Sequence, residues 1–160
     1  MQITPENIVI RRGQPGDFQA VRELDRELIA YDRQFDPSLD PEWSQSSEAM
    51  EFFEERLAGQ GVALVAEFEG HLVGCLLGAM TECASYRQTV VMAEMETLFI
   101  RGEARGTGVG KRLVGAFADW AKAEGAERIT IRVSAANRDA LRFYEREGFA
   151  AYDIVMERGL

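Results

Sequence analysis

Histidine and cysteine are scarce in this sequence, and their scarcity excludes several kinds of chemistry. The only histidine, His71, follows Glu69 and Gly70 in a predicted turn, so mechanisms centred on a histidine base are disfavoured. The two cysteines, Cys75 and Cys83, are too few for a disulfide framework, and they do not form a C-x-x-C motif typical of zinc sites. We therefore expect no metal, no cysteine nucleophile and a reducing, cytoplasmic location.

Long hydrophobic runs and an excess of positive charge are also missing. No segment holds ~18 apolar residues without a charge, so we expect neither a membrane span nor a membrane partner. The formal net charge is −9 at pH 7, which disfavours attraction to nucleic-acid phosphates. A cationic partner fits this charge better, although an acidic, well-solvated surface explains it equally well.

The length and hydrophobic content of the chain suffice for one compact fold. The chain has 160 residues, 46% of them hydrophobic, which is enough to fill one continuous core. The sequence contains neither an internal repeat nor a low-complexity tract. We therefore predict a single domain over residues 1–160.

Periodicity and turn residues predict a mixed α/β organisation. Strands are expected at residues 8–10, 62–68, 72–80, 90–100, 128–133 and 151–156. Helices are expected at residues 18–35 after Asp17, from Ser46 or Ser47 to Gly59, from about 110 to 124, and from Asn137 to Gly148. The turn at residues 69–71 makes the second and third strands an antiparallel hairpin. The result is a mixed sheet, antiparallel in its N-terminal part and flanked by about four helices.

Residues 105–112 form a basic, glycine-rich segment between a predicted strand and a predicted amphipathic helix. The first turn of a helix leaves backbone N–H groups without partners, at the positive end of the helix dipole. Glycines let a diphosphate approach the backbone, and basic side chains add attraction. The predicted phosphate-binding residues are Arg105, Gly106, Thr107, Gly108, Val109, Gly110, Lys111 and Arg112.

Two familiar nucleotide-binding loops do not match this segment. A P-loop requires glycine in place of Arg105 and serine or threonine in place of Arg112. A dinucleotide fingerprint starting at Gly106 requires glycine or alanine in place of Lys111. A glycine-rich connection without any ligand remains the alternative at this point.

The spacing Arg-x-x-Gly-x-Gly from Arg105 to Gly110 resembles the acyl-CoA pyrophosphate loop of the GCN5-related N-acetyltransferase (GNAT) family. The order of the flanking segments agrees with that family: E-T-L-F-I at 96–100, the loop and its helix, I-T-I-R-V at 129–133, and N-x-x-A-x-x-F-Y-x-x-x-G-F at 137–149. The resemblance implies the acyl-CoA N-acyltransferase fold, a splayed pair of strands that holds the cofactor, and acetyl-CoA as cosubstrate without a metal.

The resemblance also implies cofactor contacts beyond the loop. Backbone groups at Leu98, Phe99 and Ile100, freed by the splay, would bind the pantetheine arm. Asn137 would contact the cofactor from the other side, although an N-cap role explains it too. Ala140 and Phe143 would pack near the cofactor, or serve as ordinary core.

Tyr144 occupies the position of the family's usual general acid, which protonates the departing coenzyme A thiolate. Glu96 is the candidate base, because a lysine-like amine with a pKa near ~10.4 must lose a proton before it attacks. Steering of a cationic amine by the Glu96 charge is the alternative. If strand alternation is regular, Glu94, Glu96 and Leu98 share one face.

These observations predict direct transfer of an acetyl group to a primary amine on a small molecule or peptide, with a polyamine-like or lysine-like acceptor favoured. The acceptor is expected beside the irregular segments 31–50 and 81–89. Acidic residues that could attract it are Asp32, Asp36, Asp40, Glu42 and Glu94. The alternatives are a protein N-terminus or an antibiotic amine as acceptor, or a non-catalytic acyl-CoA sensor. A homodimer is compatible with the sequence.

Overall fold

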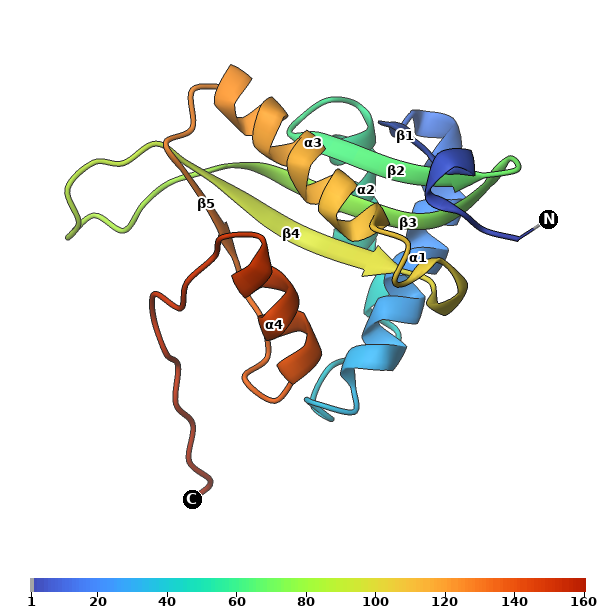
Figure 1. Ribbon diagram of the computed structural model, residues 1–160. Coiled ribbons are helices and arrows are strands. Elements are labelled where there is room, and N and C mark those ends of the chain that lie inside the picture. Colours follow the sequence, from blue (N-terminus) through green and yellow to red (C-terminus); the bar gives the residue numbers. More distant parts are fainter. Residues whose placement is uncertain (1) are drawn as a thin grey trace.

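A computed structural model describes residues 2–160, and its elements follow the predicted order except at the C-terminus. The strands are β1 (Val9–Arg12), β2 (Val62–Phe68), β3 (His71–Thr81), β4 (Met92–Ile100) and β5 (Arg128–Ile131). The helices are α1 (Phe18–Asp32), α2 (Ser47–Leu57), α3 (Val109–Ala123) and α4 (Arg138–Arg146) (Figure 1).

The five strands form one sheet in the order β1-β2-β3-β4-β5 (Figure 1). Neighbours are antiparallel as far as β4, and β4 and β5 are parallel. The β2–β3 hairpin turns at Glu69 and Gly70, whose φ angles of 49° and 80° suit a tight turn between twisted strands. The predicted mixed sheet, antiparallel in its N-terminal part, is confirmed.

Helices cover both faces of the sheet. The apolar side of α3, with Val109, Leu113 and Phe117, packs on one face and closes the larger core cluster. On the opposite face, α1 and α2 close a second cluster, to which Leu24 and Phe53 belong. α4 lies beside β4 and β5 rather than over the middle of the sheet (Figure 1).

A β-bulge interrupts β4 at Glu96, where the register with β3 shifts. Before the bulge Met95 packs in the core under α3, whereas after it Phe99 packs in the core under α1 and α2. Leu98 therefore lies on the face covered by α3. The expectation that Glu94, Glu96 and Leu98 share one face is wrong, because it assumed regular alternation.

The predicted strand at residues 151–156 is absent, since no helix or strand is present from residue 149 to residue 160. Alternating apolar residues favour an extended chain, but a strand also needs a neighbour for its backbone hydrogen bonds. Other predictions differ only at their ends: for example, α1 stops at Asp32, β4 starts at Met92 and β5 stops at Ile131.

Candidate active site

β4 loses its parallel neighbour partway along its length. The pairing with β5 ends at Met95 opposite Ile131, while β4 continues, paired with β3, as far as Ile100. On the β5 side, the last backbone groups of β4 can therefore bind an extended ligand in the manner of an added strand. The predicted splay is present, and Leu98 and Phe99 lie within it.

The segment before α3 presents an open backbone. Gly106 and Gly108 have φ angles of 76° and 81°, a region that favours glycine, and nothing lies within 4 Å of a Cβ placed on either residue. Gly108 is the N-cap of α3 and makes no side-chain cap hydrogen bond. The N–H groups at Val109 and Gly110 lack intrahelical partners for the same reason that all first-turn amides do. These features suit an anion.

The three basic side chains of this segment behave differently from one another. Arg105 folds back: its Nε donates to the Ile100 carbonyl at 2.8 Å, and its guanidinium lies 4.7 Å from the centre of the Tyr31 ring. Arg112 donates to the Pro5 carbonyl at 2.9 Å, so it ties α3 to the N-terminal segment. Lys111 is exposed, and among residues 2–160 no acidic side chain pairs with it. Only Lys111 is therefore free of internal partners. Thr107 donates its hydroxyl to the Ala104 carbonyl at 2.7 Å, which stabilises the turn.

α4 closes the other side of the site. A Cβ on Gly110 would lie 3.2 Å from the Phe143 ring and 3.0 Å from Ile100, so glycine permits this close packing. The Asn137 side chain accepts a hydrogen bond from the Ala140 amide at 3.1 Å, which is the N-cap interaction considered above. Ala140 is half-buried against the core under α3.

Tyr144 is buried, with 8% of its surface exposed. Its ring lies between Phe143 and Phe149, at centroid distances of 5.1 and 5.6 Å. Burial, and secondarily the negative charge of Asp32, raise the pKa of Tyr144. The phenol therefore keeps its proton throughout the neutral range, as a proton donor must.

Glu96 is held by a partner that the sequence did not reveal. Arg56 of α2 donates from Nε and Nη2 to the two carboxylate oxygens of Glu96, at 2.7 and 2.9 Å. The side chains of Arg56 and Glu96 are 13% and 25% exposed. This bidentate contact with the guanidinium occupies both carboxylate oxygens of Glu96. The two residues are 40 positions apart, and no local pattern connects them.

Asp32, the last residue of α1, is an acidic group close enough to Tyr144 for its charge to raise the pKa of the phenol. It is half-buried, and within residues 2–160 no side chain forms an ion pair or hydrogen bond with its carboxylate. Burial raises the pKa of Asp32. The position of α1 beside the end of β4 is fixed by Arg101, which pairs with Glu27 at 2.6 Å. The sequence analysis noted Asp32 only as one of several acidic residues.

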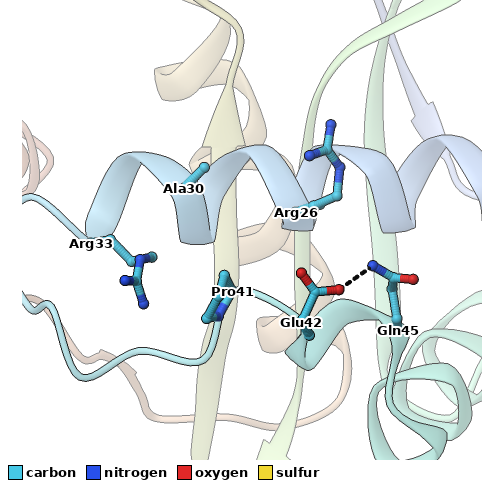
Figure 2. A pocket seen from close by; sticks show the side chains of 6 residues that line it. All are labelled: Arg26, Ala30, Arg33, Pro41, Glu42 and Gln45. Atoms are coloured by element: carbon cyan, nitrogen blue, oxygen red, sulfur yellow. Dashed lines mark hydrogen bonds between the residues drawn. The ribbon is translucent and has the colours of Figure 1, made fainter.

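Two open cavities lie elsewhere on the protein. One, of about 290 Å³, is lined by residues of α1 and of the segment that precedes α2 (Figure 2). Its lining residues are Arg26, Ala30, Arg33, Pro41, Glu42 and Gln45. The other, of about 280 Å³, lies between the start of β2 and the end of α3. Glu42, one of the acidic residues expected to attract the acceptor, lines the first cavity. Neither cavity contains a predicted catalytic or cofactor-binding residue, so the site is identified by its backbone chemistry and not by an enclosed volume. Within residues 2–160, no group of three or more His, Cys, Asp or Glu side chains could hold a metal ion, and no helix is long and apolar enough to cross a membrane.

Comparison with known proteins connects this geometry to a family. Residues 23–149 match the acetyltransferase (GNAT) family. An uncharacterized N-acetyltransferase of Bacillus subtilis, YhfO, is 29% identical over 142 residues, 88% of each chain. An uncharacterized N-acetyltransferase of Methanocaldococcus jannaschii, MJ1207, is 31% identical over 64 residues, but the match spans 40% of this chain and only 28% of that protein.

Solved structures agree on the fold. The aminoglycoside N-acetyltransferase AAC(6')-Iy in complex with CoA superimposes with a TM-score of 0.73, covering 96% of this chain and 94% of that one at 18% identity. At this identity the likeness concerns the fold alone. The family match and the relatives confirm the enzyme class predicted from the sequence, an acetyltransferase. This chain belongs to the acetyltransferase (GNAT) family.

Proposed function

We propose that this protein transfers the acetyl group of acetyl-CoA directly to a primary amine, at the site formed by the splayed end of β4, the loop before α3 and Tyr144. The observation that carries the proposal is the open backbone at Gly106 and Gly108, at the start of α3 and beside the unpaired edge of β4. No other part of the described chain combines free helix amides with a free strand edge and a buried phenol.

The residues present fit coenzyme A. The amides at the start of α3 would bind its pyrophosphate, with Lys111 as the available charge, and the edge at Leu98–Ile100 would hold the pantetheine arm. Arg105 and Arg112 each use one guanidinium nitrogen on a backbone carbonyl, at Ile100 and Pro5, and their other N–H donors would add to the attraction. Bound there, acetyl-CoA would supply an activated acetyl group as a thioester. Asn137, Ala140 and Phe143 would border the arm from the α4 side.

Tyr144 would act as the general acid. Attack of the neutral amine on the thioester carbonyl forms a C–N bond, and the attacking nitrogen then releases its extra proton to solvent. Departure of coenzyme A breaks the C–S bond and leaves a thiolate that must take up a proton. The Tyr144 hydroxyl, protonated at neutral pH because burial raises its pKa, would donate that proton.

Glu96 and Asp32 would have separate roles toward the amine. Glu96, held in place by Arg56, would attract the ammonium group toward β4. Asp32, which has no cationic partner within residues 2–160, would accept the proton of the ammonium group directly or through water. This assignment adopts the steering alternative for Glu96 and transfers the role of base to Asp32.

The proposed acceptor is a small molecule with a cationic primary amine, polyamine-like or lysine-like. Asp32 and Glu96, together with a net charge of −9, support this class. An aminoglycoside is a second candidate, because it also carries several cationic amines and a protein of the same fold is an aminoglycoside N-acetyltransferase.

Thiol release from acetyl-CoA tests the proposal, with polyamines, lysine-containing peptides and aminoglycosides as acceptors. We expect release that depends on one of these amines and that falls sharply in Tyr144→Phe. If wild type and Tyr144→Phe both bind acetyl-CoA but neither releases thiol with any acceptor, the protein is a non-catalytic acyl-CoA sensor.

A further inference from the structure

An ion pair lies at the fork where β4 and β5 separate (Figure 1). The pairing of the two strands ends at Met95 opposite Ile131, and Arg132 is the next residue of the chain after β5. Nε of Arg132 lies 3.8 Å from Oε1 of Glu94. The pair therefore lies at the entrance of the splay in which the thioester of acetyl-CoA would be held.

Glu94 lies on the same face of the sheet as Glu96. Met95, the residue after Glu94, packs in the core under α3, so Glu94 points to the opposite face. Glu96 also lies on that opposite face, where it contacts Arg56 of α2. Two residues of a strand rise by roughly 7 Å, so Glu94 and Glu96 are separated along β4 by about the length of a lysine side chain.

The guanidinium of Arg132 has no hydrogen-bonding partner within residues 2–160. Its separation of 3.8 Å from Glu94 exceeds the length of a hydrogen bond, and 94% of the Arg132 side chain is exposed. Arg56, in contrast, donates to both carboxylate oxygens of Glu96 and to the Gln60 carbonyl. Arg132 therefore keeps its N–H donors available, in a planar fork that matches a carboxylate.

The charges of this region match a small molecule with three charged groups. A carboxylate would form a bidentate contact with Arg132, and a neighbouring ammonium group would lie against Glu94, whose side chain is 27% exposed. An amine one side-chain length away would reach Glu96 and the proposed base, Asp32. A free diamino acid carries the three groups in this order. A diamine lacks the carboxylate, and a lysine within a peptide lacks both charges at its α-carbon.

We propose that the acceptor is a free diamino acid of lysine-like length, held by Arg132 at its α-carboxylate and by Glu94 at its α-ammonium group. This inference rests on the acetyl transfer proposed above. The side-chain amine attacks the thioester, so the new C–N bond forms at the side-chain nitrogen and the α-amino group stays unmodified. Of the two protons that the side-chain ammonium group loses, one goes to solvent and the other balances the proton that the coenzyme A thiolate takes up.

Thiol release with matched acceptors tests this assignment. L-lysine and cadaverine differ only in the carboxylate, and we expect kcat/KM to be at least about tenfold higher for L-lysine, chiefly through a lower KM. Lysine capped at both its amino and carboxyl ends should react no better than cadaverine. The product from L-lysine should carry the acetyl group on its side-chain nitrogen, which nuclear magnetic resonance distinguishes from the α-acetylated isomer.

Substitutions of Arg132 test its contact with the carboxylate. Arg132→Gln should raise KM for L-lysine about tenfold and change KM for cadaverine by less than about threefold. Arg132→Glu should reverse the preference, because the new carboxylate attracts the second ammonium group of cadaverine and repels the carboxylate of L-lysine. Arg128→Gln, at an exposed arginine four residues earlier in the chain, is the control and should change neither KM.

Glu94→Gln tests the contact with the α-ammonium group. The variant should raise KM for L-lysine about tenfold, with a smaller effect on 6-aminohexanoate, which has the carboxylate but no α-ammonium group. Affinity for coenzyme A should stay at the wild-type level in every variant, which shows that the fold and the cofactor site are intact.

Three results would overturn this inference and leave the acetyl transfer in place: equal kcat/KM for L-lysine and cadaverine, equal losses for both acceptors in Arg132→Gln, or acetylation of the α-amino group. If coenzyme A binds but no amine of any class releases thiol, the proposed function itself fails. Calorimetric titration of the coenzyme A complex with L-lysine then still tests the site. Absent binding, or binding that Arg132→Gln does not weaken, would overturn the contact between Arg132 and the carboxylate.

Discussion

The proposed acid chemistry of Tyr144 depends on its hydroxyl, and its packing depends on its ring. Tyr144→Phe keeps the ring contacts with Phe143 and Phe149 and removes only the proton donor. We expect kcat to fall by about 10²- to 10⁴-fold, with an unchanged affinity for coenzyme A. Steady-state kinetics and calorimetric titration measure the two effects separately. A kcat within a few-fold of wild type would remove Tyr144 from the mechanism.

Asp32→Asn tests the assignment of the base. In the wild type, activity should decline as the pH falls through the pKa of Asp32, which burial raises above its usual range. The asparagine variant should lose this acidic limb along with most of kcat. It should also move the alkaline limb to lower pH, because the Asp32 charge raises the pKa of Tyr144. A variant with the wild-type pH profile would contradict the assignment.

Glu96→Gln tests the steering role. Loss of the charge should raise KM for a cationic acceptor, with a smaller effect on kcat, because the proton acceptor remains in place. The effect on KM should shrink at high salt, since screening already weakens the attraction in the wild type. A large loss of kcat with unchanged KM would instead identify Glu96 as the base.

Residue types and spacing predicted the candidate site positions, but not the contacts that their side chains make. Arg105 and Arg112 read as phosphate ligands, yet each donates to a backbone carbonyl in this structure. The Arg56–Glu96 pair forms only when α2 packs beside β4, so its cause is tertiary packing. Such contacts leave no local pattern in a sequence.

Among elements, the N-terminus of α3 is the part on which the proposed cofactor binding depends. Gly108→Ala forces a Cβ into a left-handed backbone and into the space proposed for the pyrophosphate. We expect about 1 kcal/mol lower stability and at least a tenfold weaker affinity for coenzyme A.

Gly125→Ala is the matched control for that change. Gly125, after the other end of α3, has a φ of 89° and an equally open surrounding, so its substitution carries the same backbone cost. Coenzyme A affinity should remain at the wild-type level. Equal losses of affinity in both variants would show that strain in α3, and not a direct contact, is responsible.

The junction between α1 and the segment before α2 contains a buried acid, and it makes stability depend on pH. Asp25 is 3% exposed, accepts a hydrogen bond from Ser44 at 2.7 Å, and has a pKa raised by burial from 3.8 to about 6. The folded chain therefore binds this proton more tightly than the unfolded chain, and the free energy of unfolding falls as pH rises from about 4 to about 6. The difference of about two units corresponds to about 3 kcal/mol at most.

Asp25→Asn removes this dependence. The variant should be more stable than wild type at pH 8, by up to about 3 kcal/mol, and close to wild type at pH 4. Denaturant unfolding at several pH values measures both. A wild type whose stability does not fall between pH 4 and pH 6 relative to the variant would contradict a buried, ionising Asp25.

Most elements were predictable because their boundaries carry caps and turns, such as Asn137 before α4 and Gly70 in the hairpin. The bulge at Glu96 was not predictable from the sequence, because the extra residue in β4 depends on how β4 pairs with β3. The last strand was predicted from alternation alone, and in this chain its hydrogen-bonding neighbour is missing. The local sequence pattern specifies the conformation that a segment prefers. A strand also needs a neighbouring strand with which to form hydrogen bonds.

At the scale of the whole molecule, a net charge of −9 surrounds a site that must bind an anionic cofactor. The electrostatic field of a net negative protein repels an anionic cofactor. Binding therefore has to come from the local hydrogen-bond donors at the start of α3. Since backbone amides carry no titrating charge, coenzyme A affinity should fall only modestly with added salt, less than for a site built from several free basic side chains.

Amide chemical shifts of the ¹⁵N-labelled protein during titration with coenzyme A test the central claim most directly. We predict the largest changes at Gly106, Gly108, Val109 and Gly110, with smaller changes along the end of β4, saturating at one coenzyme A per chain. Changes concentrated at the cavity of Figure 2, or no changes near Gly108, would contradict the account.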